Sequence, residues 1–202
     1  NKDGSEGKIA GNSIRCVGKY LYDNGIVKKT KLTVDTASGV KALELFVSGG
    51  EVSSVTVDMG KVGLKPSDIP AAFEGENIVN REVKIGGKPY RITCVSVGNP
   101  HAVAFVPRVD AVDIPRVGPL FENSPLFPER INAEFVRVVN ETTLKMRVWE
   151  RGSGETLACG TGACASAVAA VLNGFCDKNT EISVYLLGGE LRITYTDQTV
   201  YM

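Results

Sequence analysis

Residues 159–174 read CGTGACASAVAAVLNG, and residues 10–25 read AGNSIRCVGKYLYDNG. In each stretch a glycine begins a segment whose residues have helical spacing, and an Asn-Gly pair ends it. The two segments are similar in length. Glycine directly after the last turn is a typical signal for the end of a helix. Self-similarity of this kind indicates that the fold contains two copies of one structural unit.

The flanks of the two stretches match as well. Polar Gly/Ser turns precede them, DGSEG at 3–7 and RGSGET at 151–156. Pairs of β-branched segments follow them, KLTVDT and KALELFV in the first copy and EISVYLL and ELRITYT in the second. We expect these pairs to be strands that turn at Ser38-Gly39 and at Gly188-Gly189. Each copy is therefore predicted to be a turn–helix–strand–strand unit.

More strands are predicted between the two copies, and few helices. Hairpin turns are expected at Gly86-Gly87 and at Asn140-Glu141. Asp68 is expected in a short helical turn, and residues 113–127 in a short helix followed by a Pro-rich loop. Both repeat helices, AVAAVL above all, are apolar nearly all round, which predicts burial inside a curled sheet. The class is α+β, with long sheets around few helices.

Composition limits the partners of the protein. The 202 residues are 43% hydrophobic and carry 23 basic against 23 acidic side chains. We find no basic stretch suited to nucleic acid or a membrane surface, no apolar run of transmembrane length, and no signal peptide. The first residues, NKDGSEGK, read as the middle of a loop, so we expect a piece of a longer protein.

Cysteine usage indicates the cytosol. Five cysteines without compact spacing argue against a disulfide scaffold, and the absence of a C-x-x-C pair argues against zinc. We therefore expect no metal and mostly buried thiols. Cys16 and Cys164, which lie inside the two predicted helices, are expected in the core.

Superposing the two copies places Ala10 opposite Cys159, each directly before the glycine that opens a helix. A helix N-terminus lowers the pKa of a thiol, and its free N–H groups bind carboxylates. Two such units facing each other across a cleft would invert a carbon next to a carboxylate without a cofactor. One thiolate would remove the proton and the opposite thiol would return one. The alternative is that Gly, Ala and Cys merely allow close helix packing.

The chain resembles diaminopimelate epimerases over essentially its whole length. The matching segments are NKDGSE (1–6), GNSIRCVGKY (11–20), VGNPHAV (97–103), ERINAEFV (129–136) and WERGSGETLACGTGA (149–163). The resemblance implies two pseudo-symmetric domains, each a curled mixed or antiparallel sheet around a central helix. Residues 1–60 would be the remainder of the N-terminal domain and residues 61–202 the C-terminal domain. The family's N-terminal segment and its last strand are expected to be missing here.

The family pattern has Cys-Gly-Asn at the first helix, where this chain has Ala10. By resemblance, Cys159 is the remaining catalytic thiol, and His101 and Glu150 assist catalysis, with His101 tuning the pKa of a catalytic cysteine. The residues implied in substrate binding are Asn1, Gly11, Asn12, Asn99, Asn132, Glu150, Arg151, Gly160 and Thr161. The open alternatives are turn formation for the asparagines, a surface salt bridge for Glu150 and Arg151, and a structural role for His101.

The implied function is cofactor-independent interconversion of LL- and meso-diaminopimelate, in the synthesis of lysine and of peptidoglycan precursors. Ala10 is expected to leave this form inactive or impaired. A cytoplasmic location and a homodimer are further expectations. Two alternatives remain open at this point. One is a diaminopimelate-binding homologue without turnover, and the other is a cysteine hydrolase built on Cys159 and His101.

Overall fold

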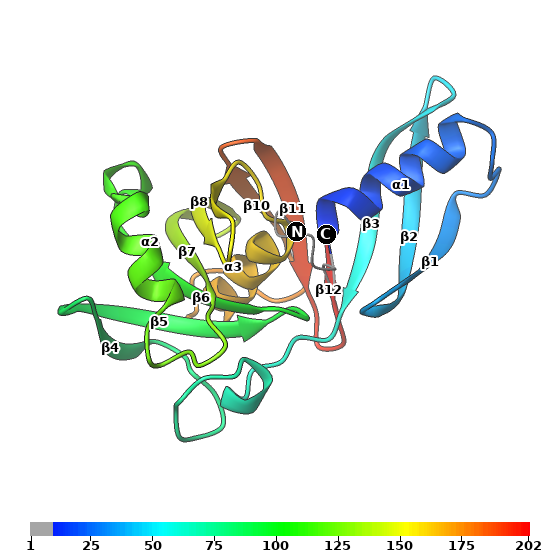
Figure 1. Ribbon diagram of the computed structural model, residues 1–202. Helices are drawn as coiled ribbons and strands as arrows, with labels where there is room; N and C mark the ends of the chain where they lie inside the picture. Colours follow the sequence, from blue (N-terminus) through cyan, green and yellow to red (C-terminus); the bar gives the residue numbers. More distant parts are fainter. Residues whose placement is uncertain (1–9) are drawn as a thin grey trace.

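The computed structural model describes residues 10–202 (Figure 1). The helices are α1 (Gly11–Asp23), α2 (Ile114–Glu122) and α3 (Gly160–Leu172), with 3₁₀ turns at Pro66–Asp68 and Val109–Ala111. The strands are β1 (Lys31–Thr36), β2 (Gly39–Ser48), β3 (Glu51–Gly60), β4 (Arg81–Ile85), β5 (Lys88–Ser96), β6 (Pro100–Phe105), β7 (Asn132–Asn140), β8 (Thr143–Glu150), β9 (Gly154–Thr156), β10 (Glu181–Leu186), β11 (Gly189–Tyr195) and β12 (Val200–Tyr201). This mixture of long sheets and few helices confirms the α+β class.

The strands form one hydrogen-bonded path in the order β1-β2-β3-β12-β11-β10-β8-β7-β6-β5-β4, with β9 beside β8. Neighbours run antiparallel except β10 with β8 and β6 with β7, which run parallel. Figure 1 shows two lobes, one of β1–β3 with α1 and one of the remaining strands around α3. β12 joins them by pairing with both β11 and β3. Because β12, at the end of the sequence, pairs with a strand of each lobe, the domain boundary expected after residue 60 stays a prediction.

The internal repeat is present in three dimensions. Asn24 and Asn173 follow the two helices, and each side-chain amide donates to the carbonyl four residues earlier, 2.9 Å to Tyr20 and 2.7 Å to Ala169. The hairpins that follow, β1–β2 and β10–β11, turn at equivalent glycines. Gly39 pairs with Thr36 and Gly189 pairs with Leu186.

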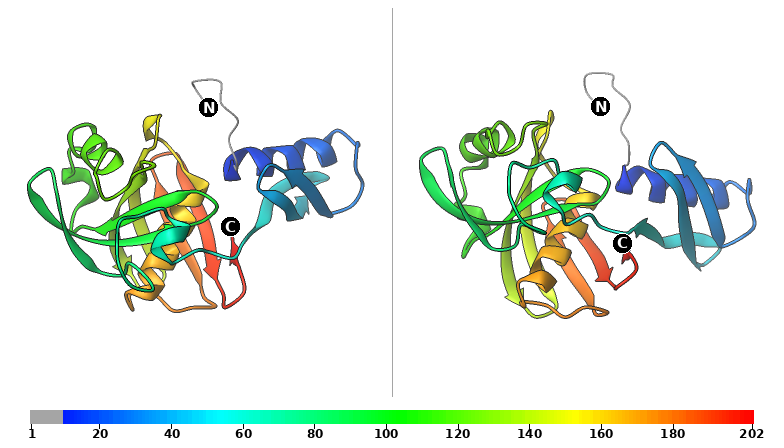
Figure 2. Two further views of the ribbon diagram at one scale, coloured as in Figure 1. Left: turned by 60° about the horizontal axis from the view of Figure 1, so that its bottom comes forward. Right: turned by 90° about the horizontal axis from the view of Figure 1, so that it is seen from below.

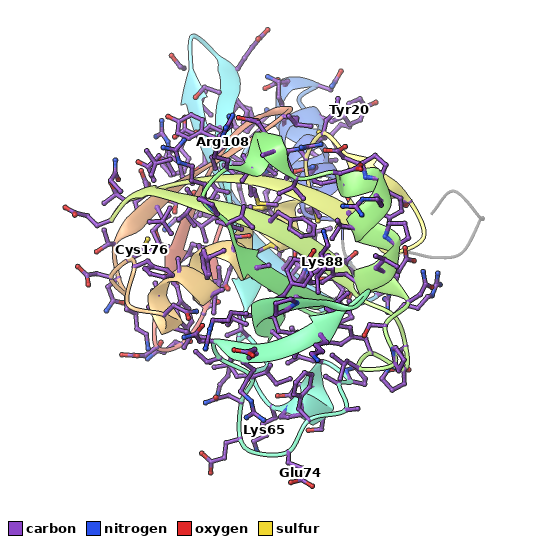
Figure 3. All side chains as sticks on the ribbon, turned by 90° about the vertical axis from the view of Figure 1, so that its left-hand side faces the viewer. Tyr20, Lys65, Glu74, Lys88, Arg108 and Cys176 are labelled. Atoms are coloured by element: carbon purple, nitrogen blue, oxygen red, sulfur yellow. The ribbon has the colours of Figure 1, made fainter. Side chains whose placement is uncertain are left out.

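The two repeat helices differ in burial. Every residue of α3 from Gly160 to Ala170 is buried, as predicted, because strands of the larger lobe pack around the helix. The same expectation is wrong for α1, in which only Gly11, Ile14 and Gly18 are buried. Strands β3 and β2 cover one face of α1 and leave the other open, and Tyr20 projects from that open face, 62% exposed (Figure 3).

Most of the turns and short helices lie where the sequence signals predict them. Gly86 and Gly87 form the β4–β5 turn with φ of 58° and 78°, as a tight hairpin requires. The β7–β8 turn lies one residue later than expected, because Asn140 pairs with Thr143. The short turn at Pro66–Asp68 and the helix α2 are confirmed. The expectation of a core position holds for Cys164 but is wrong for Cys16, which lies on the open face of α1.

Candidate active site

The first turns of α1 and α3 meet at two glycines. A Cβ atom on Gly160 would lie 3.4 Å from the Cα of Gly11, and one on Gly11 would lie 3.6 Å from the Cα of Gly160. The side chain of Met202 packs against both positions. Figure 2 shows the beginning of α1 directed toward the lobe that contains α3. A Cβ atom at either position would lie 2.9 Å from the end of the Met202 side chain, so a larger residue there would require Met202 to move.

The residues before the two helices adopt the same extended conformation. Ala10 has φ −131° and ψ 91°, and Cys159 has φ −130° and ψ 111°. Asn12 links the two turns, because its Nδ2 donates to the carbonyl of Ala158 at 3.5 Å. The backbone N–H groups at the start of a helix have no partner within the helix and carry partial positive charge. Two such groups of donors therefore converge at this point, which suits a carboxylate.

The sulfur of Cys159 is buried and receives two hydrogen-bond contacts. The N–H of Gly162 donates to Sγ at 3.3 Å, and the hydroxyl of Thr161 lies 3.5 Å away. Burial raises the pKa of the Cys159 thiol to about 12, and the charges of Glu150 and Glu134 add to this effect. The two hydrogen bonds lower the pKa without reversing the shift. The expected lowering is wrong for this site, because desolvation of the thiolate outweighs the donors at the helix N-terminus.

His101 is completely buried and forms no hydrogen bond with the sulfur of Cys159. Its Nδ1 lies 2.6 Å from Oε1 of Glu134, and its Nε2 lies 2.9 Å from Oδ1 of Asn99. Asn99 in turn reaches Thr161, with Nδ2 donating to Oγ1 at 3.2 Å. Both ring nitrogens are therefore occupied, and a direct thiolate–imidazole pair of the cysteine hydrolase type is not formed.

Asn132 and Arg151 come together through the backbone. The Oδ1 of Asn132 accepts the N–H of Arg151 at 2.8 Å, and its Nδ2 donates to the carbonyl of Pro100 at 2.8 Å. Asn132 is buried at the beginning of β7, so it is not a turn-former. The Nη1 of Arg151 donates to the carbonyl of Glu129 at 2.9 Å. No ion pair joins Arg151 to Glu150 among residues 10–202, so the surface salt bridge considered above is not present.

Glu150 ends β8, next to Arg151. One of its carboxylate oxygens, Oε1, accepts the hydroxyl of Thr156 at 2.5 Å. The negative charge of Glu150 disfavours the Cys159 thiolate and is the second-largest cause, after burial, of the raised pKa of that thiol. The structure therefore brings Cys159, Glu150, Asn99, His101 and Thr161 into one neighbourhood. Asn1 lies outside the described residues.

Two buried carboxylates near these residues were missed by sequence reasoning. Glu134 contacts His101 and is the third residue of β7, within its buried first half, and a charged residue beside apolar ones there was the available signal. Glu122, at the end of α2, accepts from Nε1 of Trp149 at 2.7 Å, from Nη1 of Arg130 at 3.0 Å and from the N–H of Gly152 at 2.9 Å. It thereby fixes the turn that carries Arg151, and no sequence signal indicated this role.

The part of the chain that the structure describes holds no cluster of three or more His, Cys, Asp or Glu side chains arranged for a metal ion. None of its helices combines the length and apolar character needed to span a membrane.

The fold of this protein is also found in solved racemase and epimerase structures. It superposes on a probable proline racemase from Agrobacterium radiobacter with a TM-score of 0.71 at 13% identity, over 96% of this chain and 64% of that one. It superposes on a hydroxyproline epimerase from Agrobacterium vitis with a TM-score of 0.70 at 14% identity, over 96% of this chain and 63% of that one. The chain thus spans slightly less than two thirds of these two proteins, and the likeness shows the shared fold.

Sequence comparison identifies the family within this class. The family model for diaminopimelate epimerase matches residues 1–65 and 93–202. A diaminopimelate epimerase of Acetivibrio thermocellus is 53% identical over all of this chain and 72% of its own length, and one of Desulfovibrio desulfuricans is 50% identical over 100% and 72%. The chain belongs to the diaminopimelate epimerase family, a family of isomerases.

Proposed function

We propose that this chain acts on diaminopimelate, with Cys159 transferring the α-proton on one face of the reacting carbon. The observation that carries the proposal is the meeting of α1 and α3 at Gly11 and Gly160, with Ala10 and Cys159 in equivalent positions. In a two-base epimerase each of these positions supplies one proton-transferring thiol. Ala10 has no ionisable group, so this form retains one of the two.

The chemistry follows from what each group can do. The Cys159 thiolate takes the α-proton, and the electron pair of the C–H bond moves into the adjacent carboxylate. The converging N–H groups of α1 and α3 stabilise the negative charge that develops there. Reprotonation by the same thiol restores the original configuration, because no acid faces the other side. Deuterium from solvent would enter by this route without inversion.

The remaining site residues recognise the polar ends of the substrate in this proposal. Arg151 offers a planar fork of donors suited to a carboxylate, and Glu150 suits an ammonium group. Gly11, Asn12, Gly160 and Thr161 present the backbone N–H groups, and Asn1, Asn99 and Asn132 contribute amide contacts. Asn132 would act with Arg151, to whose backbone it is bonded.

The biological setting stays part of the proposal. A diaminopimelate epimerase serves the synthesis of lysine and of peptidoglycan precursors. We infer a cytoplasmic location from cysteine usage, and we infer a homodimer from the family resemblance alone. No cofactor is required by the proton-transfer scheme.

Proton NMR in deuterated water tests the proposal. We expect the chain to exchange the α-proton of one diaminopimelate stereoisomer without forming the other, and Cys159→Ser to abolish that exchange. Equal exchange in both proteins would overturn the role of Cys159. Tight binding with no exchange, even after Ala10→Cys, would instead indicate a binding protein without turnover.

A further inference from the structure

Five polar side chains form a continuous series of contacts that ends at the sulfur of Cys159. Glu134 Oε1 lies 2.6 Å from His101 Nδ1, and His101 Nε2 lies 2.9 Å from Asn99 Oδ1. Asn99 Nδ2 lies 3.2 Å from Thr161 Oγ1, which lies 3.5 Å from Cys159 Sγ. The series connects strands β6 and β7 of the larger lobe to the first turn of α3.

The amide of Asn99 determines the direction of the hydrogen bonds along this series. Its oxygen only accepts and its nitrogen only donates. The Nε2 of His101 therefore carries a proton that it donates to Asn99 Oδ1, and Thr161 Oγ1 accepts from Asn99 Nδ2. Because Thr161 accepts from Asn99, its own hydroxyl proton is left free to point at the sulfur of Cys159.

The far end of the series is held firmly. The side chains of His101 and Glu134 are both 0% exposed. Glu134 Oε2 has no hydrogen-bond partner among the described residues, so the bond to His101 is the principal side-chain contact of this carboxyl group. A Cβ on Gly162 would lie 2.8 Å from Glu134 Oε1, so the absence of a side chain at position 162 lets Glu134 occupy this place.

We propose that Asn99 is a positioning residue for Cys159: held by His101 against Glu134, its amide directs the hydroxyl proton of Thr161 at the sulfur and stabilises the thiolate. The inference rests on the proposed function, because it matters for catalysis only if Cys159 transfers a proton.

The surroundings of Cys159 explain why such a donor is needed. Burial and the charges of Glu150 on β8 and Glu134 on β7 all disfavour the thiolate. The groups that oppose them are the Thr161 hydroxyl and the N–H of Gly162. The N–H is fixed by the helix, whereas a hydroxyl rotates and needs a neighbour that occupies its acceptor side.

The first part of the test measures the reactivity of Cys159 without substrate. Alkylation by iodoacetamide at fixed pH is followed by peptide mass spectrometry, because the thiolate is the reacting form. Thr161→Val is expected to slow alkylation of Cys159 roughly tenfold, the scale of one hydrogen bond to a charged group. Thr161→Ser keeps the hydroxyl and is the matched control. The exposed Cys16 in the same samples reports any change in reagent or folding.

The second part is a double-mutant cycle with Asn99→Asp. The new carboxylate oxygen replaces the amide nitrogen and accepts the Thr161 hydroxyl proton, which then no longer points at the sulfur. The added charge affects both backgrounds equally, so it cancels in the cycle. We expect Thr161→Val to have little further effect when Asn99→Asp is present. If the two sites were independent, the fold-changes in alkylation rate of the two single variants would multiply to within about twofold in the double variant. That result would overturn the proposal.

A spectroscopic measurement on the unsubstituted chain keeps the proposal testable if a variant fails to fold. His101 is the single histidine of the sequence, so its ring ¹⁵N signals are unambiguous. We expect Nε2 to be protonated, and an unprotonated Nε2 would overturn the proposal. Because neither readout uses diaminopimelate, failure here is distinguishable from failure of the proposed function.

Discussion

Gly11 and Gly160 approach each other so closely that a Cβ on Gly160 would lie 3.4 Å from the Cα of Gly11 and 2.9 Å from Sδ of Met202. The contact brings together two helix N-termini that lie 149 positions apart in the sequence, and a side chain at either glycine would need Met202 to move.

Gly160→Ala is therefore expected to destabilise the fold by about 1–3 kcal/mol, because the added methyl group would lie 2.9 Å from Sδ of Met202 and this side chain would have to repack. Thermal unfolding followed by circular dichroism measures the loss. Ser13→Ala, an exposed change in the first turns of α1, is the control and should stay within about 0.5 kcal/mol. Equal stability of Gly160→Ala and the original chain would show that Met202 does not pack against Gly160 as described.

Ala10→Cys should restore inversion of the α-carbon. A second acid–base group contributes about 10²–10⁴-fold to such a reaction, so the gain in LL-to-meso conversion should be large. Coupled optical or NMR assays of both stereoisomers measure it. A chain with Ala10 that epimerises as fast as the Ala10→Cys variant would contradict the two-thiol scheme.

Alkylation of Cys159 should accelerate as pH rises, by about tenfold per unit, up to the region of its raised pKa of about 12. The rate rises with pH because burial raises the pKa and keeps the thiol protonated at neutral pH. The reactive thiolate therefore forms only as the pH becomes alkaline. Peptide mass spectrometry separates Cys159 from the other cysteines. A rate that is already constant at neutral pH would show that the helix N-terminus, rather than burial, sets this pKa.

Arg151→Lys should weaken diaminopimelate binding, because an ammonium group cannot replace a two-pronged contact to a carboxylate. Isothermal titration measures the affinity. Arg116→Lys is the matched control, since Arg116 is exposed on α2 and its ion pair within residues 10–202 is with Asp113. Unchanged affinity in Arg151→Lys would remove Arg151 from the binding site.

Glu122→Gln should cost about 1–3 kcal/mol of stability, because the carboxylate accepts from Trp149, Arg130 and Gly152 at once. The amide nitrogen that replaces one oxygen cannot accept from any of these donors. Urea unfolding gives the difference, with Glu129→Gln, an exposed neighbour in sequence, as the control. Similar losses of unfolding free energy in the two variants would show that Glu122 does not stabilise the turn that carries Arg151.

Local signals determined much of this protein. The glycine that opens each helix, the Asn-Gly that ends it and the hairpin glycines all act within a few residues, so the repeat and its strand pairs are readable in the sequence. Ala10 and Cys159 are recognisable as equivalent for the same reason, because each directly precedes the glycine that begins a repeat helix. The family pattern, spread over several such segments, added the function.

Contacts between distant segments were decided only by the tertiary structure. The pKa of Cys159 is raised because the packed fold removes water from the thiol and places the charges of Glu134 on β7 and Glu150 on β8 near it, and no pattern around residue 159 reports that burial. The open face of α1 likewise depends on how many strands surround it. Glu134 and Glu122 gained their roles from donors on other elements, 27 or more positions away for His101 and Trp149. Desolvation and long-range hydrogen bonding depend on the packed neighbours of a residue, and neighbours in space are set by the fold.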